Sequence, residues 1–167
     1  MQRPPFPHHP ALSDDTILLR QIAPHEVSQL IDISFYDAKQ ATTVDQAASM
    51  LARIAEDYRA GNTIHWGIED KATHRLVGTC GYYRGFEKER GELGCVLLEP
   101  FRGQGYMAKA LKLVIEFGKS ELALKAIVAI TSRQNRPAIR LMEGLAFREA
   151  ATLPDGYVEY IYPLETI

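Results

Sequence analysis

The sequence predicts one α/β (α+β) domain, built on a mixed and mostly antiparallel sheet of about six to seven strands with about four helices. Two features of the element order carry this prediction. Three consecutive strand-like segments separated by polar turns indicate an antiparallel meander, and the later order strand, helix, strand indicates a parallel pair with a helical crossover. A chain of 167 residues with 46% hydrophobic content can bury one sizeable core but is too short for two ordinary domains.

The chain begins with an arm that we expect to be extended over residues 1–12, ahead of the domain at residues 13–167. Four prolines occur in the stretch from Met1 to Pro10, and proline cannot continue a helix. His8 and His9 are adjacent in this stretch, but no third ligand is spaced to join them. We therefore predict no metal site.

The first elements of the domain are a strand and a helix. Residues 16–22 form a β-branched and aliphatic run that predicts the strand. Pro24 then permits a helix start, and the apolar positions of this helix are Val27, Leu30 and Ile31.

Residues 42–60 carry the clearest helical pattern in the first part of the chain. Either Thr42 or Thr43 can cap the first turn, and Gly61 stops the last one. The apolar positions recur at intervals of three and four: Val44, Ala47, Ala48, Leu51, Ile54, Ala55 and Tyr58.

The remaining elements follow from alternating strand and helix patterns. The meander consists of three strands, at residues 63–69, 75–84 and 92–98. The crossover unit that follows consists of a helix, a fully apolar strand and a second helix, at residues 106–119, 124–130 and 135–145. Two final strands form a hairpin around Pro154-Asp155-Gly156, at residues 147–153 and 157–164.

Composition and charge exclude several classes of function. The formal net charge is -2, from 19 Lys and Arg against 21 Asp and Glu, so no surplus of positive charge can grip a nucleic-acid backbone. The chain has no long uncharged apolar run and no signal-peptide pattern. With Cys80 and Cys95 as its two cysteines, both expected to stay reduced, we expect a cytoplasmic protein with neither a nucleic-acid nor a membrane partner.

Two glycines stand where the third meander strand gives way to a helix. The first turn of a helix leaves backbone N–H groups unpaired and carries partial positive charge, so a diphosphate can accept hydrogen bonds from several of them. Gly103 and Gly105 keep side chains away from such a ligand, and Arg102 can add a charged contact. A tight turn that binds nothing has the same local pattern. The segment lacks the signatures of a phosphate loop and of a dinucleotide fold.

A resemblance to a known family is carried by the string Leu97-Leu98-Glu99-Pro100-Phe101-Arg102-Gly103-Gln104-Gly105-Tyr106-Met107-Ala108. It resembles the cofactor motif of the GNAT acetyltransferase superfamily, Arg/Gln-x-x-Gly-x-Gly/Ala. Its Gly-Tyr-Met form is similar to the branch of RimJ/RimL-type ribosomal-protein N-terminal acetyltransferases. The helix from Asn135 to Leu145-Ala146-Phe147 is similar to the family's Asn-x-x-Ser...Gly-Phe segment. The resemblance covers roughly residues 16–164, with specific motifs only between residues 92 and 147.

The resemblance implies a sheet whose central parallel strands splay apart, with acetyl-CoA as co-substrate in the gap. It assigns the pantetheine arm to backbone groups of Val96, Leu97 and Leu98. It assigns the pyrophosphate, beside Arg102, to the amides of Gly103, Gln104, Gly105, Tyr106, Met107 and Ala108. Asn135 is expected to face the cofactor near its reactive end.

Acetyl transfer to an amine needs a group that takes the amine proton, and Glu92 is our candidate because it lies on the strand beside the implied gap. It can also be an ordinary carboxylate at a strand end in water. The acid is not identified, because Met142 occupies the position of the family's tyrosine and Ala138 that of a frequent serine. Four tyrosines remain candidates: Tyr106, Tyr157, Tyr160 and Tyr162.

We therefore expect an N-acetyltransferase that transfers the acetyl group of acetyl-CoA to a primary amine by direct attack in a ternary complex. The amine is a protein N-terminus or a small molecule, and a homodimer is compatible with the apolar final strands. The alternative is a non-catalytic acyl-CoA-binding or sensing module of the same fold. We interpret His65 and His74 as structural or solvated. Four aromatic residues either line an acceptor pocket or pack within the sheet: Trp66, Tyr82, Tyr83 and Phe86.

Overall fold

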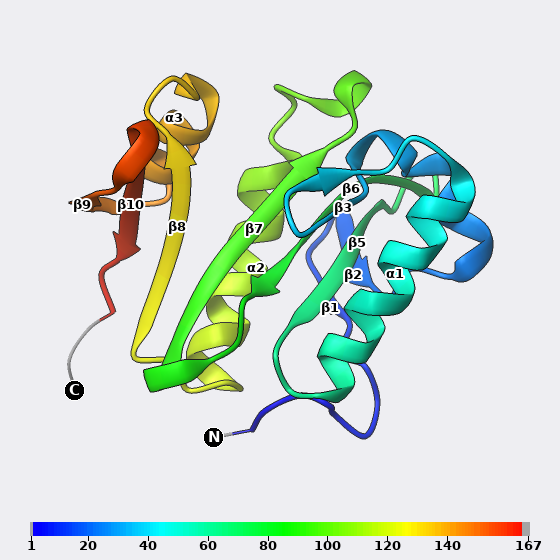
Figure 1. The fold of residues 1–167 in the computed structure, drawn as a ribbon, viewed down its shortest axis with the longest axis horizontal. Coiled ribbons are helices and arrows are strands. Elements are labelled where there is room, and N and C mark those ends of the chain that lie inside the picture. The colour runs from blue at the N-terminus through cyan, green and yellow to red at the C-terminus, as the bar shows by residue number, and fades with distance from the viewer. Residues whose placement is uncertain (1, 165–167) are drawn as a thin grey trace.

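The structure is a computed structural model that describes residues 2–164. Its main element is an eight-stranded sheet in which every neighbouring pair is antiparallel except β7 and β8 (Figure 1). The predicted mixed, mostly antiparallel α/β fold is therefore confirmed. The strands, in spatial order, are β1 (Leu12–Ser13), β2 (Ile17–Arg20), β5 (Ile64–Asp70), β6 (Arg75–Tyr83), β7 (Arg90–Leu97), β8 (Ala126–Ser132), β10 (Tyr157–Tyr162) and β9 (Arg148–Thr152).

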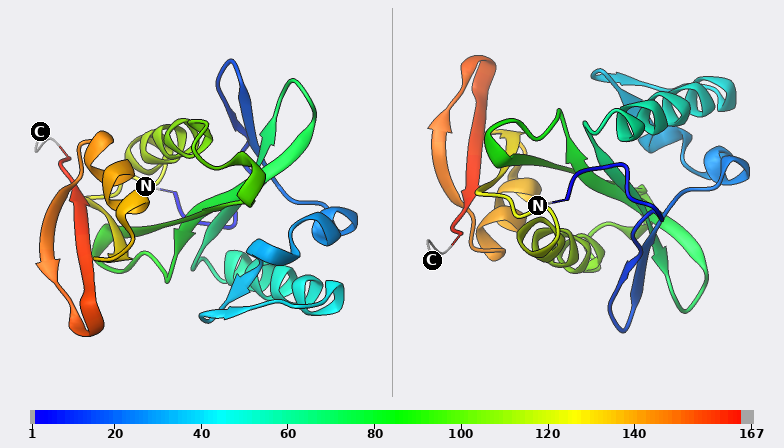
Figure 2. Two further views of the ribbon diagram at one scale, coloured as in Figure 1. Left: turned by 90° about the horizontal axis from the view of Figure 1, so that it is seen from above. Right: turned by 90° about the horizontal axis from the view of Figure 1, so that it is seen from below.

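Helices cover both faces of this sheet. Figure 2 shows α1 (Val44–Arg59) and α2 (Tyr106–Ser120) on opposite sides of it. The third α-helix, α3 (Arg136–Gly144), links β8 to the final hairpin. Short 3-10 helices complete the described chain, together with a small hairpin of β3 (Phe35–Tyr36) and β4 (Lys39–Gln40); the 3-10 helices are η1 (Pro24–Gln29), η2 (Ile31–Ile33), η3 (Glu87–Glu89), η4 (Glu99–Phe101) and η5 (Pro154–Gly156).

The main core lies between the sheet and α2. Trp66 and Tyr82 are fully buried there, and the Trp66 ring meets the edge of Phe117 with centroids 5.3 Å apart. The Tyr82 hydroxyl donates to the Val114 carbonyl at 2.9 Å, which satisfies the one polar atom of this buried ring. A Cβ on Gly118 would lie 2.2 Å from the same hydroxyl, so this close approach requires glycine.

Local sequence signals account for α1. The helix begins directly after Thr43, whose side chain accepts a hydrogen bond from the Gln46 amide at 3.2 Å. It ends before Gly61, which has a φ of 84° in the left-handed region. Both the cap and the stop follow the prediction, because capping and the glycine turn depend on neighbouring residues only.

The helix predicted after Pro24 is wrong in type. The segment forms the two 3-10 helices η1 and η2 instead of one α-helix. Its buried residues are Val27, Leu30 and Ile33, which are spaced by three. A 3-10 helix has three residues per turn, so this spacing aligns all three on one face.

The parallel pair β7–β8 separates partway along its length. The two strands are paired from Arg90 with Ala126 to Leu93 with Ala129, whereas β7 continues to Leu97 and β8 to Ser132 (Figure 1). The expected splay is therefore present. We call the last paired position, Leu93, the apex of the split.

Residues 2–11 form no helix or strand, but they contact the domain. The Phe6 amide donates to the Tyr58 hydroxyl at 2.9 Å, and the Trp66 indole donates to the Pro10 carbonyl at 2.7 Å. The predicted boundary between arm and domain, at residue 12, stays a prediction.

Candidate active site

The turn between β7 and α2 has the backbone that its two glycines predict. Gly103 and Gly105 have φ values of 72° and 86°, in the left-handed region that favours glycine. A Cβ at either position would meet no atom within 4 Å. The glycines are therefore required by the backbone conformation, and the space beside them is open to a ligand.

The start of α2 presents a row of unpaired amides to that space. Within the described chain, the amides of residues 103–108 donate no hydrogen bond, and the first donor is Lys109, to the Gly105 carbonyl at 3.3 Å. The amides expected for the pyrophosphate, from Gly103 to Ala108, are thus free. A helix of 15 residues adds the partial positive charge of its dipole at this end.

The side chains of Arg102 and Gln104 brace the turn from within. Arg102 donates from Nε to the Leu97 carbonyl at 3.2 Å, and Gln104 donates to the Pro100 carbonyl at 2.9 Å. Arg102 therefore does not reserve its whole guanidinium for a phosphate. Counting back three residues from Gly103 also places Pro100, not Arg or Gln, at the first position of the GNAT motif.

Tyr106 and Met107 offer the site their amides and not their side chains. The Tyr106 ring packs edge-on against Phe101, and desolvation and the nearby Asp70 carboxylate raise the pKa of its phenol. Met107 is buried in the main core. Ala108 likewise contributes a free amide in the first turn.

The edge of β7 beyond the apex turns alternate backbone groups toward the gap. At the paired end of the two strands, the Lys125 amide donates to the Glu89 carbonyl. The backbone N–H and C=O groups of the odd-numbered residues of β7 therefore point toward β8. The backbone groups of Leu97 and Cys95 therefore point to the side of β8, although the Leu97 carbonyl already accepts from Arg102, and the role of Leu97 toward the cofactor stays a prediction.

The other two backbone assignments are corrected by the same geometry. Val96 points toward β6, and Leu98 has both of its groups engaged, with its amide on the Val77 carbonyl at 2.9 Å and its carbonyl accepting from Phe101 at 3.0 Å. The resemblance carried over three consecutive residues, whereas strand geometry presents every second one.

A cavity of about 1010 Å³ opens on the opposite face of the sheet, between α1, the 3-10 helices η1 and η2, and strands β5 to β8. Its apolar wall includes Leu30, Leu51 and Ile54, and its polar groups include Tyr36, Asp57 and Glu92. The cavity reaches β7 and β8 at the split, where its lining includes Gly94, Cys95 and Ile130.

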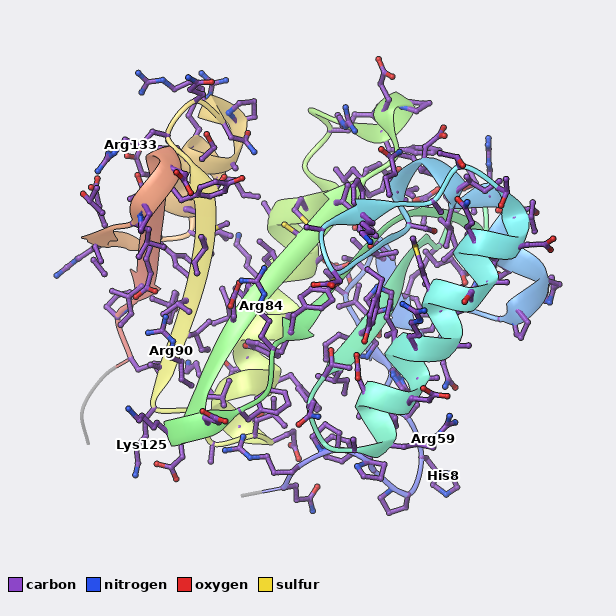
Figure 3. All side chains as sticks on the ribbon, viewed as in Figure 1. His8, Arg59, Arg84, Arg90, Lys125 and Arg133 are labelled. Carbon is purple, nitrogen blue, oxygen red and sulfur yellow. The ribbon has the colours of Figure 1, made fainter. Side chains whose placement is uncertain are left out.

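Glu92 lies where the cavity meets the apex. Its side chain is 21% exposed, and its carboxylate lies 3.1 Å from the guanidinium of Arg84. Figure 3 labels Arg84. Burial raises the pKa of Glu92, while the positive charges of Arg84 and Arg90 act in the opposite direction. A carboxylate with a raised pKa next to a cavity is suited to accept a proton near neutral pH.

The cavity also contains two groups that sequence reasoning did not assign to a site together. His65 lies on β5, and burial lowers its pKa to about 4, so its imidazole is neutral near pH 7. The ring of Tyr83, on β6, lies 6.0 Å from that of His65. Strand register brings these groups together. His65 pairs with Gly81, which in turn pairs with Gly94, and Tyr83 pairs with Glu92 two residues away on the same strands.

The remaining aromatic candidates divide between the two faces of the sheet. Tyr83 lines the cavity, and Trp66 and Tyr82 belong to the core beneath α2. Phe86 does both, because it lines the cavity and its ring also packs edge-on against Tyr82, with centroids 6.1 Å apart. His74 lies at a strand turn, with its imidazole 3.1 Å from the Glu69 carboxylate, and does not line the cavity.

Asn135 caps α3 instead of standing free. Its side-chain oxygen accepts from the Ala138 amide at 3.3 Å. Met142, at the position of the family's tyrosine, is buried in the core, so α3 offers no proton donor there. Of the other tyrosines, Tyr160 is buried and Tyr157 is 47% exposed.

The site therefore combines a helix start with free amides, a split strand pair and a cavity lined by the half-buried carboxylate of Glu92. Residues 9–148 match the family model described as Acetyltransferase (GNAT) domain. The chain belongs to the GNAT acetyltransferase family, whose members use acetyl-CoA as co-substrate.

Relatives in bacteria agree with this assignment. The uncharacterized N-acetyltransferase YoaA of Bacillus subtilis (strain 168) is 27% identical over 165 residues, which cover 94% of this chain and 93% of YoaA. The uncharacterized N-acetyltransferase p20 of Bacillus licheniformis is 29% identical over 145 residues, covering 86% of this chain and 79% of p20.

Solved structures share the fold at low identity. A Vibrio cholerae protein provisionally assigned as a ribosomal-protein-serine acetyltransferase has a TM-score of 0.78 at 17% identity, covering 96% of this chain and 99% of its own. The dodecameric spermidine N-acetyltransferase of Vibrio cholerae has a TM-score of 0.73 at 14% identity, covering 89% and 94%.

Among residues 2–164, no helix combines the length and apolar character needed to cross a bilayer. Within the same residues, no three His, Cys, Asp or Glu side chains gather into a possible metal site.

Proposed function

We propose that this chain transfers the acetyl group of acetyl-CoA to a primary amine by direct attack in a ternary complex. The observation that carries the proposal is a cavity that lies against the split strand pair. The cavity beneath α1 reaches β7 and β8 where they separate, and Glu92 lines it there.

The residues beyond the apex fit acetyl-CoA. The free amides of residues 103–108 and the open space beside Gly103 and Gly105 suit a diphosphate. The gap-facing backbone groups of Cys95 and Leu97 lie two residues apart on the same side of β7, and the Cys95 groups and the Leu97 amide suit the amide groups of a pantetheine arm, because Arg102 already donates to the Leu97 carbonyl. Such an arm would run from the open end of the split toward the apex and bring the thioester close to Glu92.

Glu92 acts as the base in this scheme. The amine enters through the cavity, its nitrogen forms a bond to the acetyl carbon, and the carbon–sulfur bond breaks with its electron pair on sulfur. Glu92 takes one amine proton, directly or through water, and the thiolate gains a proton from water after it leaves. Holding both substrates at the apex supplies much of the rate by proximity.

The acceptor is either a protein N-terminus or a small-molecule amine. The Gly-Tyr-Met motif favours the RimJ/RimL-type branch, and the fold neighbours include both an enzyme provisionally assigned to ribosomal-protein serine and one that acts on spermidine. We place the reaction in the cytoplasm, where the free thiols Cys80 and Cys95 stay reduced, and retain a homodimer as a prediction.

The test is an acetyl-CoA assay that follows CoA release with three classes of acceptor: peptides that begin with serine or alanine, spermidine, and simple alkylamines. We expect turnover with one class and a mass increase of one acetyl group on that amine. Calorimetry with acetyl-CoA accompanies the assay. Tight binding without turnover would support the non-catalytic acyl-CoA-binding module instead, and absence of binding would refute the cofactor site itself.

A further inference from the structure

The cavity side of the apex is occupied by a ring from the neighbouring strand. Gly94 is the first residue of β7 beyond the apex, and it shares the cavity face with Glu92. A Cβ on Gly94 would lie 2.1 Å from Cε2 of Tyr83. The Tyr83 ring therefore lies directly on Gly94, at the point where the strands part.

Tyr83 and Glu92 are also direct cross-strand partners. They pair in the register of β6 and β7, and both line the cavity. Opposite residues of a hydrogen-bonded antiparallel pair have Cα atoms about 5.5 Å apart, so the two side chains can contact one ligand atom between them.

The Tyr83 hydroxyl has no hydrogen-bond partner among the described residues, although burial raises the pKa of this phenol. It therefore stays a neutral hydroxyl with oxygen lone pairs free to accept. Arg3 Nη1 is the one buried side-chain polar atom without a partner among the described residues, so the Tyr83 hydroxyl is open to the cavity and can pair with water or with a ligand that enters. Tyr36, in the same cavity, differs because its hydroxyl donates to the Asp57 carboxylate at 2.9 Å.

We infer that Tyr83 is a specificity-determining residue that selects primary amines, by accepting one N–H of the attacking nitrogen while Glu92 accepts the other. This inference rests on the proposed acetyl transfer. A neutral primary amine has two N–H groups and one lone pair. With both N–H groups held by Tyr83 and Glu92, the lone pair is left to point at the acetyl carbon in the split.

The proton balance follows from this arrangement. The new carbon–nitrogen bond forms as the carbon–sulfur bond breaks toward sulfur, and Glu92 removes one proton. The second N–H stays in the amide product and keeps its hydrogen bond to Tyr83. A secondary amine has a single N–H, which Glu92 needs, so its substituent meets the Tyr83 oxygen and leaves that oxygen unpaired.

The experiment compares a primary amine with its N-methyl derivative. The amine is the serine- or alanine-initiated peptide, spermidine or alkylamine that the wild-type protein acetylates fastest, and kcat/KM is measured for both forms at saturating acetyl-CoA. In Tyr83→Phe, which keeps the ring on Gly94 and removes the hydroxyl, we expect the preference for the primary amine to fall about tenfold. Affinity for acetyl-CoA and the melting temperature are expected to stay at wild-type values.

Two further variants separate this role from a structural one. Tyr36→Phe removes a hydroxyl from the same cavity but not from the apex, so its preference should match the wild type. Gly94→Ala forces the Tyr83 ring away, so a folded Gly94→Ala protein should lose the preference as Tyr83→Phe does.

Each failure has its own meaning. An unchanged preference in Tyr83→Phe, in a protein that does acetylate amines, overturns this inference and leaves the proposed function standing. A wild-type protein that acetylates no amine overturns both.

Discussion

Replacing Gly105 with Asp and, separately, with Asn tests the diphosphate site by charge alone. The two side chains have the same shape, and both residue types tolerate the left-handed conformation that Gly105 has, with its φ of 86°. Neither meets a protein atom, because a Cβ there has nothing within 4 Å. The two variants therefore differ only in one negative charge placed where we expect two more.

Coulomb's law sets the size of the effect. One charge against two at about 6 Å gives about 1.4 kcal/mol in water, and roughly four times as much at the effective dielectric constant near a protein surface. We therefore expect Gly105→Asp to bind acetyl-CoA at least tenfold more weakly than Gly105→Asn. Calorimetry at low and high salt measures the difference, which should shrink as salt screens it.

In the absence of the cofactor, we expect the variant that binds acetyl-CoA more weakly to have the higher thermal stability. Gly105 is the N-cap of α2, where a carboxylate interacts favourably with the helix dipole by about 0.3–1 kcal/mol. Gly105→Asp should therefore melt slightly above Gly105→Asn on its own and bind the cofactor less well. Equal affinities of the two variants would show that no diphosphate binds at this turn.

Three other outcomes are expected. Glu92→Gln should lower kcat/KM about 100-fold. Because burial raises the pKa of Glu92, the wild-type rate should rise with pH through a value above the usual glutamate range, and the variant should lack this rise. An unchanged rate in the variant would refute the assignment of Glu92 as the base. Thr43→Ala should lower the free energy of unfolding by about 1 kcal/mol in urea titrations, through loss of the α1 cap, and no loss would show that the cap is unimportant. A hydrogen bond from Arg20 lowers the folded-state pKa of Glu69. The stability that this interaction contributes is therefore present above the unfolded-state pKa and is lost as pH falls through the folded-state pKa. Arg20→Met should flatten this part of the acid-unfolding curve, and an unaltered curve would contradict the role of the Arg20–Glu69 pair.

The elements that the sequence predicted well depend on neighbours along the chain. The limits of α1 follow from Thr43 and Gly61, and the parallel pairing of β7 and β8 follows from the helix between them. The turn at Gly103 and Gly105 belongs to the same group, because a left-handed backbone and a helix start are both local features. The turn that we propose for the cofactor is therefore predictable from the sequence.

The segment after Pro24 was predicted less well for a physical reason. Val27 and Leu30 suit either an α-helix or a 3-10 helix, and the choice depends on how closely the segment packs over the cavity and α1. The backbone contacts of β7 show the same limit. The residues whose backbone groups face the gap are set by the pairing of β7 with β6 and β8. This pairing cannot be predicted from the sequence of β7 alone.

The sequence by itself determined the fold class, the family and the position of the glycine turn, because these rest on periodicity, caps and a contiguous motif. Only the tertiary structure decided which side chains share the cavity at the apex. His65, Tyr83 and Glu92 lie on three different strands, and register and the alternation of faces bring them to one cavity. Contacts between strands arise from the packing of the whole sheet, so no local pattern in the chain contains them.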